Sequence, residues 1–221
     1  MDQLSGEPQR EYSMRTHLRL LVAGSVTLAV GFCMLAGSGT TADDKKDKAA
    51  KGPRDEVRKI ADALAKEDTA GAKAQAKALA AKVDDLDDIM HMFSPRKPDG
   101  TGGEGIGSKP AAIKPDCIEV KIQYLGKRVL PTELKNDNAA FQRMAYITAA
   151  IAEIAQNKCP VEKKMGEKDP AKWKKWSEDM RESALDLAKA VKANDAASVK
   201  KTAFKLDNTC RECHGVFRDN K

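Results

Sequence analysis

The chain has 221 residues, 33% of them charged and 41% hydrophobic, with a formal net charge of +6. A nucleic-acid-binding protein of this charge would interleave basic with aromatic residues or carry a recognisable binding motif, and neither pattern is present. About 180 residues remain once an N-terminal apolar segment is set aside, enough for one domain with a hydrophobic core.

The N-terminus has the layout of a bacterial secretory signal, with three arginines before the uncharged apolar run 20–37. Small residues at positions 40–42 predict cleavage after Ala42, so residues 1–42 are interpreted as a signal peptide and the mature protein as periplasmic. The apolar run could nearly span a bilayer, which leaves an uncleaved membrane anchor as the alternative.

Lysine-rich residues 43–53 are expected to form a flexible basic arm, and residues 54–221 a helical domain. Immediately after Pro53, the spacing of Val57, Ile60 and Leu64 predicts a short helix, interpreted as an extra element beside the core.

A longer helix is predicted over about 70–93, because apolar residues recur there at alternating spacings of four and three. Its stripe consists of Ala72, Ala76, Leu79, Val83, Leu86, Met90 and Phe93. This pattern is typical of a helix in a bundle.

Residues 94–114 are rich in glycine and proline and are expected to form a long loop. Three of its glycines match the spacing of a dinucleotide-binding loop by chance, since no strand precedes them. A short helix over 116–128 follows, with Asp116 as its expected N-cap and Glu119 three residues later.

Three further helices complete an all-α, four-helix bundle with the 70–93 helix. They are predicted over 132–158, from Pro170 to the Asn194-Asp195 turn, and from there to the C-terminus. Apolar positions of the last helix place Cys210 and Cys213 on its core-facing stripe.

The motif that attaches a c-type haem is present at Cys210-Arg211-Glu212-Cys213-His214. It provides two thiols for thioether bonds and an imidazole for the iron. On a helix, spacings of three and four bring these side chains to one face. The sequence therefore predicts one covalent haem c with its iron. The alternative of a haem-free zinc module lacks a second close pair of ligands.

The order of helices and the ending Cys210 to His214, Phe217, Arg218 resemble the class II cytochromes c, the cytochrome c-prime group. The resemblance is closest over about 169–219. It implies thioethers at the two cysteines, His214 as the proximal iron ligand and Arg218 near a haem propionate. Such a cation would tend to raise the reduction potential.

The sixth iron ligand separates two functions in this group. The resemblance implies that a member with methionine as the sixth ligand is a low-spin electron carrier. It also implies that a member with an apolar residue at that position is five-coordinate and binds NO or CO. It places this residue on the first bundle helix, where Met90 lies on the apolar stripe and Met92 about 200° away around the helix. Met90 is thus the favoured ligand, while His91, Met92 and Met144 remain alternatives.

The function expected is a one-electron carrier rather than an enzyme, with redox proteins as partners and acidic ones favoured by the basic charge. A membrane contact is expected only if the signal is uncleaved, and a homodimer is left open. Cys117 and Cys159 are candidates for a disulfide, given the oxidising compartment.

Overall fold

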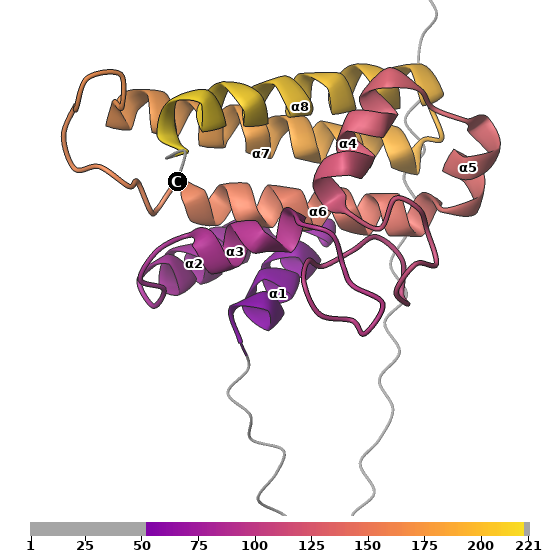
Figure 1. Cartoon of the computed structure of the whole chain (residues 1–221), viewed down its shortest axis with the longest axis horizontal. Helices are drawn as coiled ribbons and strands as arrows, with labels where there is room; N and C mark the ends of the chain where they lie inside the picture. The colour runs from indigo at the N-terminus through magenta and orange to yellow at the C-terminus, as the bar shows by residue number, and fades with distance from the viewer. Residues whose placement is uncertain (1–51, 219–221) are drawn as a thin grey trace, which may run out of the picture. The chain divides into compact units, whose positions relative to one another are not determined.

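A computed structural model describes residues 52–218, and every named secondary-structure element of this part is a helix (Figure 1). The signal peptide, its cleavage site and nearly all of the basic arm lie outside the described residues. No helix between residues 52 and 218 is long and apolar enough to cross a membrane. The all-α helical bundle predicted from the sequence is confirmed.

The α-helices are α1 (Pro53–Ala65), α2 (Thr69–Ala80), α3 (Asp87–Met90), α4 (Ile118–Lys127), α5 (Pro131–Asn136), α6 (Asn138–Ala155), α7 (Pro170–Lys192) and α8 (Ala196–Phe217), with a 3-10 turn, η1 (His91–Phe93).

The last three helices form the centre of the bundle, with α7 packed against both α6 and α8. Their starts follow the expected capping chemistry. Asp169 accepts a hydrogen bond from the Ala171 amide before α7, and Asp195 accepts from two amides at the start of α8. The helix predicted over 132–158 is instead two helices, because α5 ends at Asn136 and α6 begins at Asn138.

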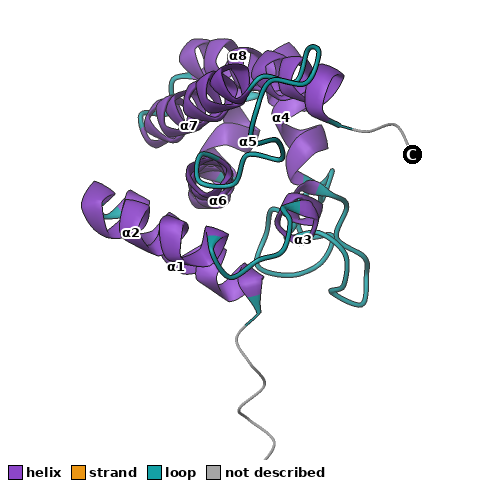
Figure 2. Ribbon diagram, turned by 90° about the vertical axis from the view of Figure 1, so that its left-hand side faces the viewer, coloured by secondary structure: helices purple, strands orange, loops and turns teal. Residues whose placement is uncertain are grey.

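The fourth helix that packs on this group is α4. The prediction that the helix over 70–93 fills this place is wrong. Helix α4 packs on α8, whereas α2 packs on α1 and α6 (Figure 2). Gly126 explains the close approach, since a Cβ there would lie 3.1 Å from the backbone nitrogen and Cα of Phe204. The chain has no side chain at this position, so the two helices can meet backbone to backbone.

The continuous helix predicted over 70–93 is also wrong. Helix α2 ends at Ala80, and six residues separate it from the four-residue α3. Asp85 favours this break, because its carboxylate accepts a hydrogen bond from the Asp87 amide at 2.8 Å. Such local side-chain bonds compete with helical ones. The regular apolar spacing therefore continues through residues 81–86, although the helix does not.

Helix α1 belongs to the core rather than beside it. Val57 and Ile60 are fully buried, and α1 packs against α6 and α2. The interpretation of α1 as an element outside the core was therefore wrong.

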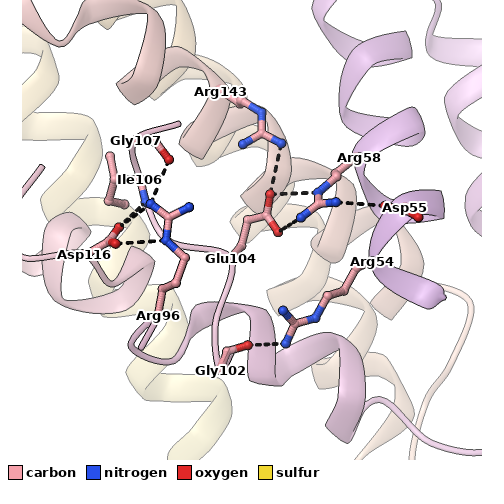
Figure 3. A network of polar contacts seen from close by, with 10 residues as sticks. All are labelled: Arg54, Asp55, Arg58, Arg96, Gly102, Glu104, Ile106, Gly107, Asp116 and Arg143. Atoms are coloured by element: carbon pink, nitrogen blue, oxygen red, sulfur yellow. Dashed lines mark hydrogen bonds and ion pairs between the residues drawn. The ribbon is translucent and has the colours of Figure 1, made fainter. Parts of the chain in front are cut away.

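The loop between η1 and α4 is fastened by two acidic groups, the buried Glu104 and the partly buried Asp116 (Figure 3). Glu104 accepts hydrogen bonds from Arg58 at 2.9 and 2.7 Å and from Arg143 at 3.0 Å, which ties the loop to α1 and α6. Asp116 pairs with Arg96 at 2.9 Å. Asp116 is therefore not the N-cap of α4, a position that Cys117 occupies without a side-chain cap.

Candidate haem-attachment site

The candidate site lies on the last two turns of α8. Cys210, Cys213 and His214 all fall within this helix, so their spacings of three and four place them on neighbouring positions of one side. Both thiols are free and only partly buried, and His214 is exposed. The structure thus brings the three predicted attachment residues together at the surface of a regular helix.

Both thiols are held in the neutral form. Burial raises the pKa of Cys210 to about 12, with smaller contributions from Asp207 and Cys213. Burial also raises the pKa of Cys213 to about 11, and the nearby Cys159 thiol adds to this effect. Burial lowers the pKa of His214, and the charge of Arg218 lowers it further. A neutral imidazole is the form that binds iron.

The end of α8 is fixed by aromatic contacts with α7. The Phe217 ring meets Trp173 and Trp176 edge-on, with centroids 5.0 and 6.0 Å apart. The indole nitrogen of Trp173 donates to the Ala155 carbonyl oxygen at 2.7 Å, and that of Trp176 donates to Glu212 at 3.2 Å. Helices α6 and α7 therefore hold the attachment residues in place.

Arg218 follows directly after α8 as its C-cap, and its amide donates to the carbonyl oxygen of His214 at 3.2 Å. Its side chain is exposed and lowers the pKa of His214 by its charge. The contact of Arg218 with a haem propionate stays a prediction.

Two residues flank the attachment motif that the sequence alone did not single out for this role. Glu119 at the start of α4 lies close enough to affect the ionisation of both Cys210 and His214. Cys159, just beyond α6, does the same for Cys213. Neither could be found from the sequence, because each depends on how α4 and the end of α6 pack around α8.

The segment 83–93 is hydrogen-bonded near each of its ends, to the residue before Cys159 and to the residue before α4. Lys158 donates from its Nζ to the carbonyl oxygen of Val83 at 2.8 Å, next to Cys159. The Cys117 thiol donates to the carbonyl oxygen of Phe93 at 3.1 Å, at the start of α4. Figure 2 shows α4 lying between α8 and α3. We call residues 83–93 the strap, since they run from the end of α6 to the start of α4.

The three candidate ligands on the strap have different surroundings. Met92 is 0% exposed and belongs to the protein core. His91 is exposed and lines a shallow depression together with Arg54 and Arg58 of α1. Met90 is only partly buried against the core. The expectation that Met90 shares a helical stripe with Leu79 was wrong, because the helix is broken between them.

The other candidate residues have structural roles. Met144 on α6 is 1% exposed and fills the core. The disulfide considered between Cys117 and Cys159 is not formed, since both are free thiols and Cys117 instead donates to Phe93.

The donor set fits a covalent haem better than a metal ion held by protein alone. Two partly buried thiols and one imidazole stand at the required spacing, and both thiols pack against the apolar core, which suits an apolar ring system. By contrast, residues 52–218 contain no group of three or more His, Cys, Asp or Glu side chains arranged to hold a metal ion. The zinc alternative is therefore unsupported.

Comparison with known proteins agrees with this site. Residues 137–218 match the family model described as cytochrome c'. The matched segment covers α6, α7 and α8 and includes the whole attachment motif and Arg218. No curated protein and no solved structure matches the chain. The family match supports a class II c-type cytochrome with covalently bound haem and iron, and it leaves α1 to α5 outside the similarity.

Proposed function

We propose that this protein is a periplasmic mono-haem c-type cytochrome that carries single electrons and is not an enzyme. The observation that carries the proposal is the attachment motif, Cys210 to His214, on the exposed end of a fixed helix. The family match over residues 137–218 supports the haem. The choice of electron transfer over gas binding rests on Met90, a methionine of the strap that is only partly buried. Export rests on the signal-like N-terminus alone.

Each site residue would have a separate task. Cys210 and Cys213 would hold the haem through thioether bonds, and His214 would bind the iron from the proximal side. When bound, the haem supplies an iron that gains and loses one electron. Trp173, Trp176 and Phe217 hold the last turns of α8 through contacts within the protein, and these contacts would not depend on the oxidation state of a bound haem. A fixed environment lowers the reorganisation needed for electron transfer.

Met90 is the proposed distal ligand, on the basis of its partial burial. Among the three candidates on the strap, Met92 is already enclosed by protein and His91 lines the depression beside α1. Met90 alone combines a thioether with a partly open environment. A methionine ligand raises the reduction potential of a haem and leaves no free site for a gas.

The alternative is a five-coordinate protein that binds NO or CO. One observation favours it: Met90 sits in a helix of only four residues, so its position depends on the bonds at the two ends of the strap. If the strap holds the thioether away from the iron, a coordination site stays open for a gas.

The test is to mature the full chain in a bacterial periplasm and examine the purified protein. Mass spectrometry should find one haem that survives acid extraction, and single Cys210→Ser and Cys213→Ser variants should each lose one thioether bond. The oxidised protein should show low-spin bands with a weak absorption at the red end of the spectrum. Haem that extracts freely would overturn the haem assignment, and rapid CO binding by the reduced wild-type protein would replace the carrier with the gas binder.

A further inference from the structure

The outward face of α8 carries an exposed phenylalanine among cations. Phe204 is 56% exposed, a large fraction for an aromatic side chain. Lys200, Lys201 and Arg211 are exposed and stand four, three and seven residues from it, so they share its side of the helix. We call these four residues, together with Lys127 on the adjacent α4, the basic face.

Three of the four cations of this face have no acidic partner nearby among residues 52–218. Residues 200–211 contain four cationic side chains and one acidic side chain, Asp207. Asp207 is buried and pairs with Arg211 of its own helix. Within the described part of the chain, Lys127, Lys200 and Lys201 form no ion pair, whereas two lysines of α7 are paired with aspartates. The face therefore presents a net positive charge to solvent.

The apolar centre of the face is held rigidly. Because Gly126 lies against the Phe204 backbone, α4 and α8 pack closely at this point, and movement of one helix along the other would disturb this contact. Figure 1 shows α4 crossing α8. A fixed apolar centre with a charged rim is the usual composition of a protein-binding surface.

The basic face also adjoins the haem-attachment motif. Arg211 stands between Cys210 and Cys213, and Phe204 lies six positions before Cys210, about 9 Å of rise along the helix. A protein that covers both Phe204 and Arg211 would therefore reach the turn that carries Cys210 and Cys213. Short separation matters because the rate of electron transfer falls steeply with distance.

We infer that the basic face is the docking surface for an acidic redox protein, with Phe204 as the central contact and the lysines as the steering charges. This inference rests on the proposed electron-carrier function. In the encounter, one electron leaves the ferrous iron, which becomes ferric, and reduces the oxidised partner by one electron. A second copy of this chain is a poorer occupant, because two such faces would repel each other.

Oxidised plant plastocyanin, a small acidic copper protein, serves as the probe, and its Cu(II) is reduced to Cu(I) by the ferrous cytochrome. Stopped-flow absorbance gives the rate constant at low and high ionic strength. Replacing Lys200→Glu and Lys201→Glu together should lower the rate constant at low salt about tenfold, and the difference should shrink at high salt. Phe204→Ala should lower it about fivefold at both salt concentrations, since an apolar contact is not screened.

The matched control reverses two exposed lysines of α2, Lys73→Glu and Lys77→Glu, which changes the net charge equally on a helix that does not pack on α8. Its rate constant should fall by less than about twofold. Equal losses in both double variants would mean that only net charge matters and would overturn the inference. So would a Phe204→Ala variant with an unchanged rate, or a wild-type dimer that Phe204→Ala dissociates.

The outcomes separate this inference from the proposed function. Covalent haem, a low-spin spectrum and oxidation by hexacyanoferrate(III) in every variant would support the carrier while the plastocyanin rates decide the docking surface. Absence of haem, or a wild-type protein that neither oxidant oxidises, would count against the carrier itself.

Discussion

The indole nitrogen of Trp176 on α7 donates a hydrogen bond to the carboxylate of Glu212 on α8 at 3.2 Å. Glu212 is one of the two residues between Cys210 and Cys213. The helix α7 thus holds the attachment turn through one of its intervening residues as well as through Phe217, which is 6.0 Å from the Trp176 ring centroid.

Replacing Trp176→Phe should remove this hydrogen bond while keeping an aromatic ring beside Phe217. Because the bond lies at the surface, the free energy of unfolding should fall by only about 0.5–1 kcal/mol. Glu212→Gln keeps an oxygen that can accept from the indole, so its loss should be smaller. Thermal unfolding of the haem-bearing variants measures both, and a larger loss for Glu212→Gln than for Trp176→Phe would contradict this account.

Glu104 should be a main determinant of stability in the loop between η1 and α4. Its side chain is 1% exposed and accepts from Arg58 and Arg143, so Glu104→Gln takes the anion from Arg143 and leaves Arg58 with Asp55 alone. Removing one partner of a buried ion pair costs about 3–5 kcal/mol, and the partial exposure of both arginines reduces this to about 2–3 kcal/mol.

The matched control for Glu104 is Glu56→Gln, which removes a pair with Lys82 at the surface. An exposed pair contributes at most about 1 kcal/mol, so this variant should unfold almost like the wild type in urea. Similar losses for the two variants would show that the loop is not held by Glu104.

Asp116 should make the protein sensitive to acid. Burial alone would raise the pKa of this carboxyl, but hydrogen bonds from Arg96 and from the Ile106 and Ala111 amides outweigh it and lower the pKa below 3.8. A carboxyl whose pKa is lowered by folding stabilises the protein fully above its unfolded value, and this contribution is lost as the pH falls through the folded value. The loss is therefore expected below about pH 4.

Asp116→Asn tests this pH dependence. The variant should be less stable than the wild type at pH 7, and the gap should narrow as the pH falls below 4, because the wild type then loses the same charge. Urea unfolding at a series of pH values measures the gap. A constant gap would mean that Asp116 acts through its shape rather than through its charge.

The sequence was sufficient for the parts of the fold that local chemistry determines. Asp169 before Pro170, and Asp195 at the start of α8, predicted the helix starts that the structure contains. The attachment motif was equally local, since its spacing places the three side chains on one side of any helix. These signals need no knowledge of how helices pack.

The packing partners could not be predicted in the same way. The apolar spacing from Ala72 to Phe93 continues through residues 81–86, where the Asp85 carboxylate accepts a hydrogen bond from the Asp87 amide and no helix forms. The pairing of α4 with α8 depends on Gly126, whose missing side chain has no meaning in the sequence until Phe204 is opposite it. The neighbours of the site, Glu119 and Cys159, follow from that same packing.

Met90 and Met92 provide the decisive comparison for the distal ligand, because they are two residues apart on the strap and differ in burial. Met92 is fully enclosed by protein, whereas Met90 is only partly buried. Met90→Ala should abolish the weak red absorption, lower the reduction potential and open the reduced protein to CO, since the iron loses its thioether. Its effect on global unfolding should be the smaller of the two.

Met92→Ala should give the opposite pattern. Removing a buried methionine side chain leaves a cavity and costs about 2–5 kcal/mol in the free energy of unfolding, but the absorption spectrum of the folded protein should stay that of the wild type. Spectra, CO titration and urea unfolding on both variants separate ligand from core residue. If Met92→Ala changes the spectrum and Met90→Ala does not, the ligand is Met92 and the strap must rearrange around the haem. If neither changes it and the wild type already binds CO, the iron has no methionine ligand and the gas-binding alternative holds.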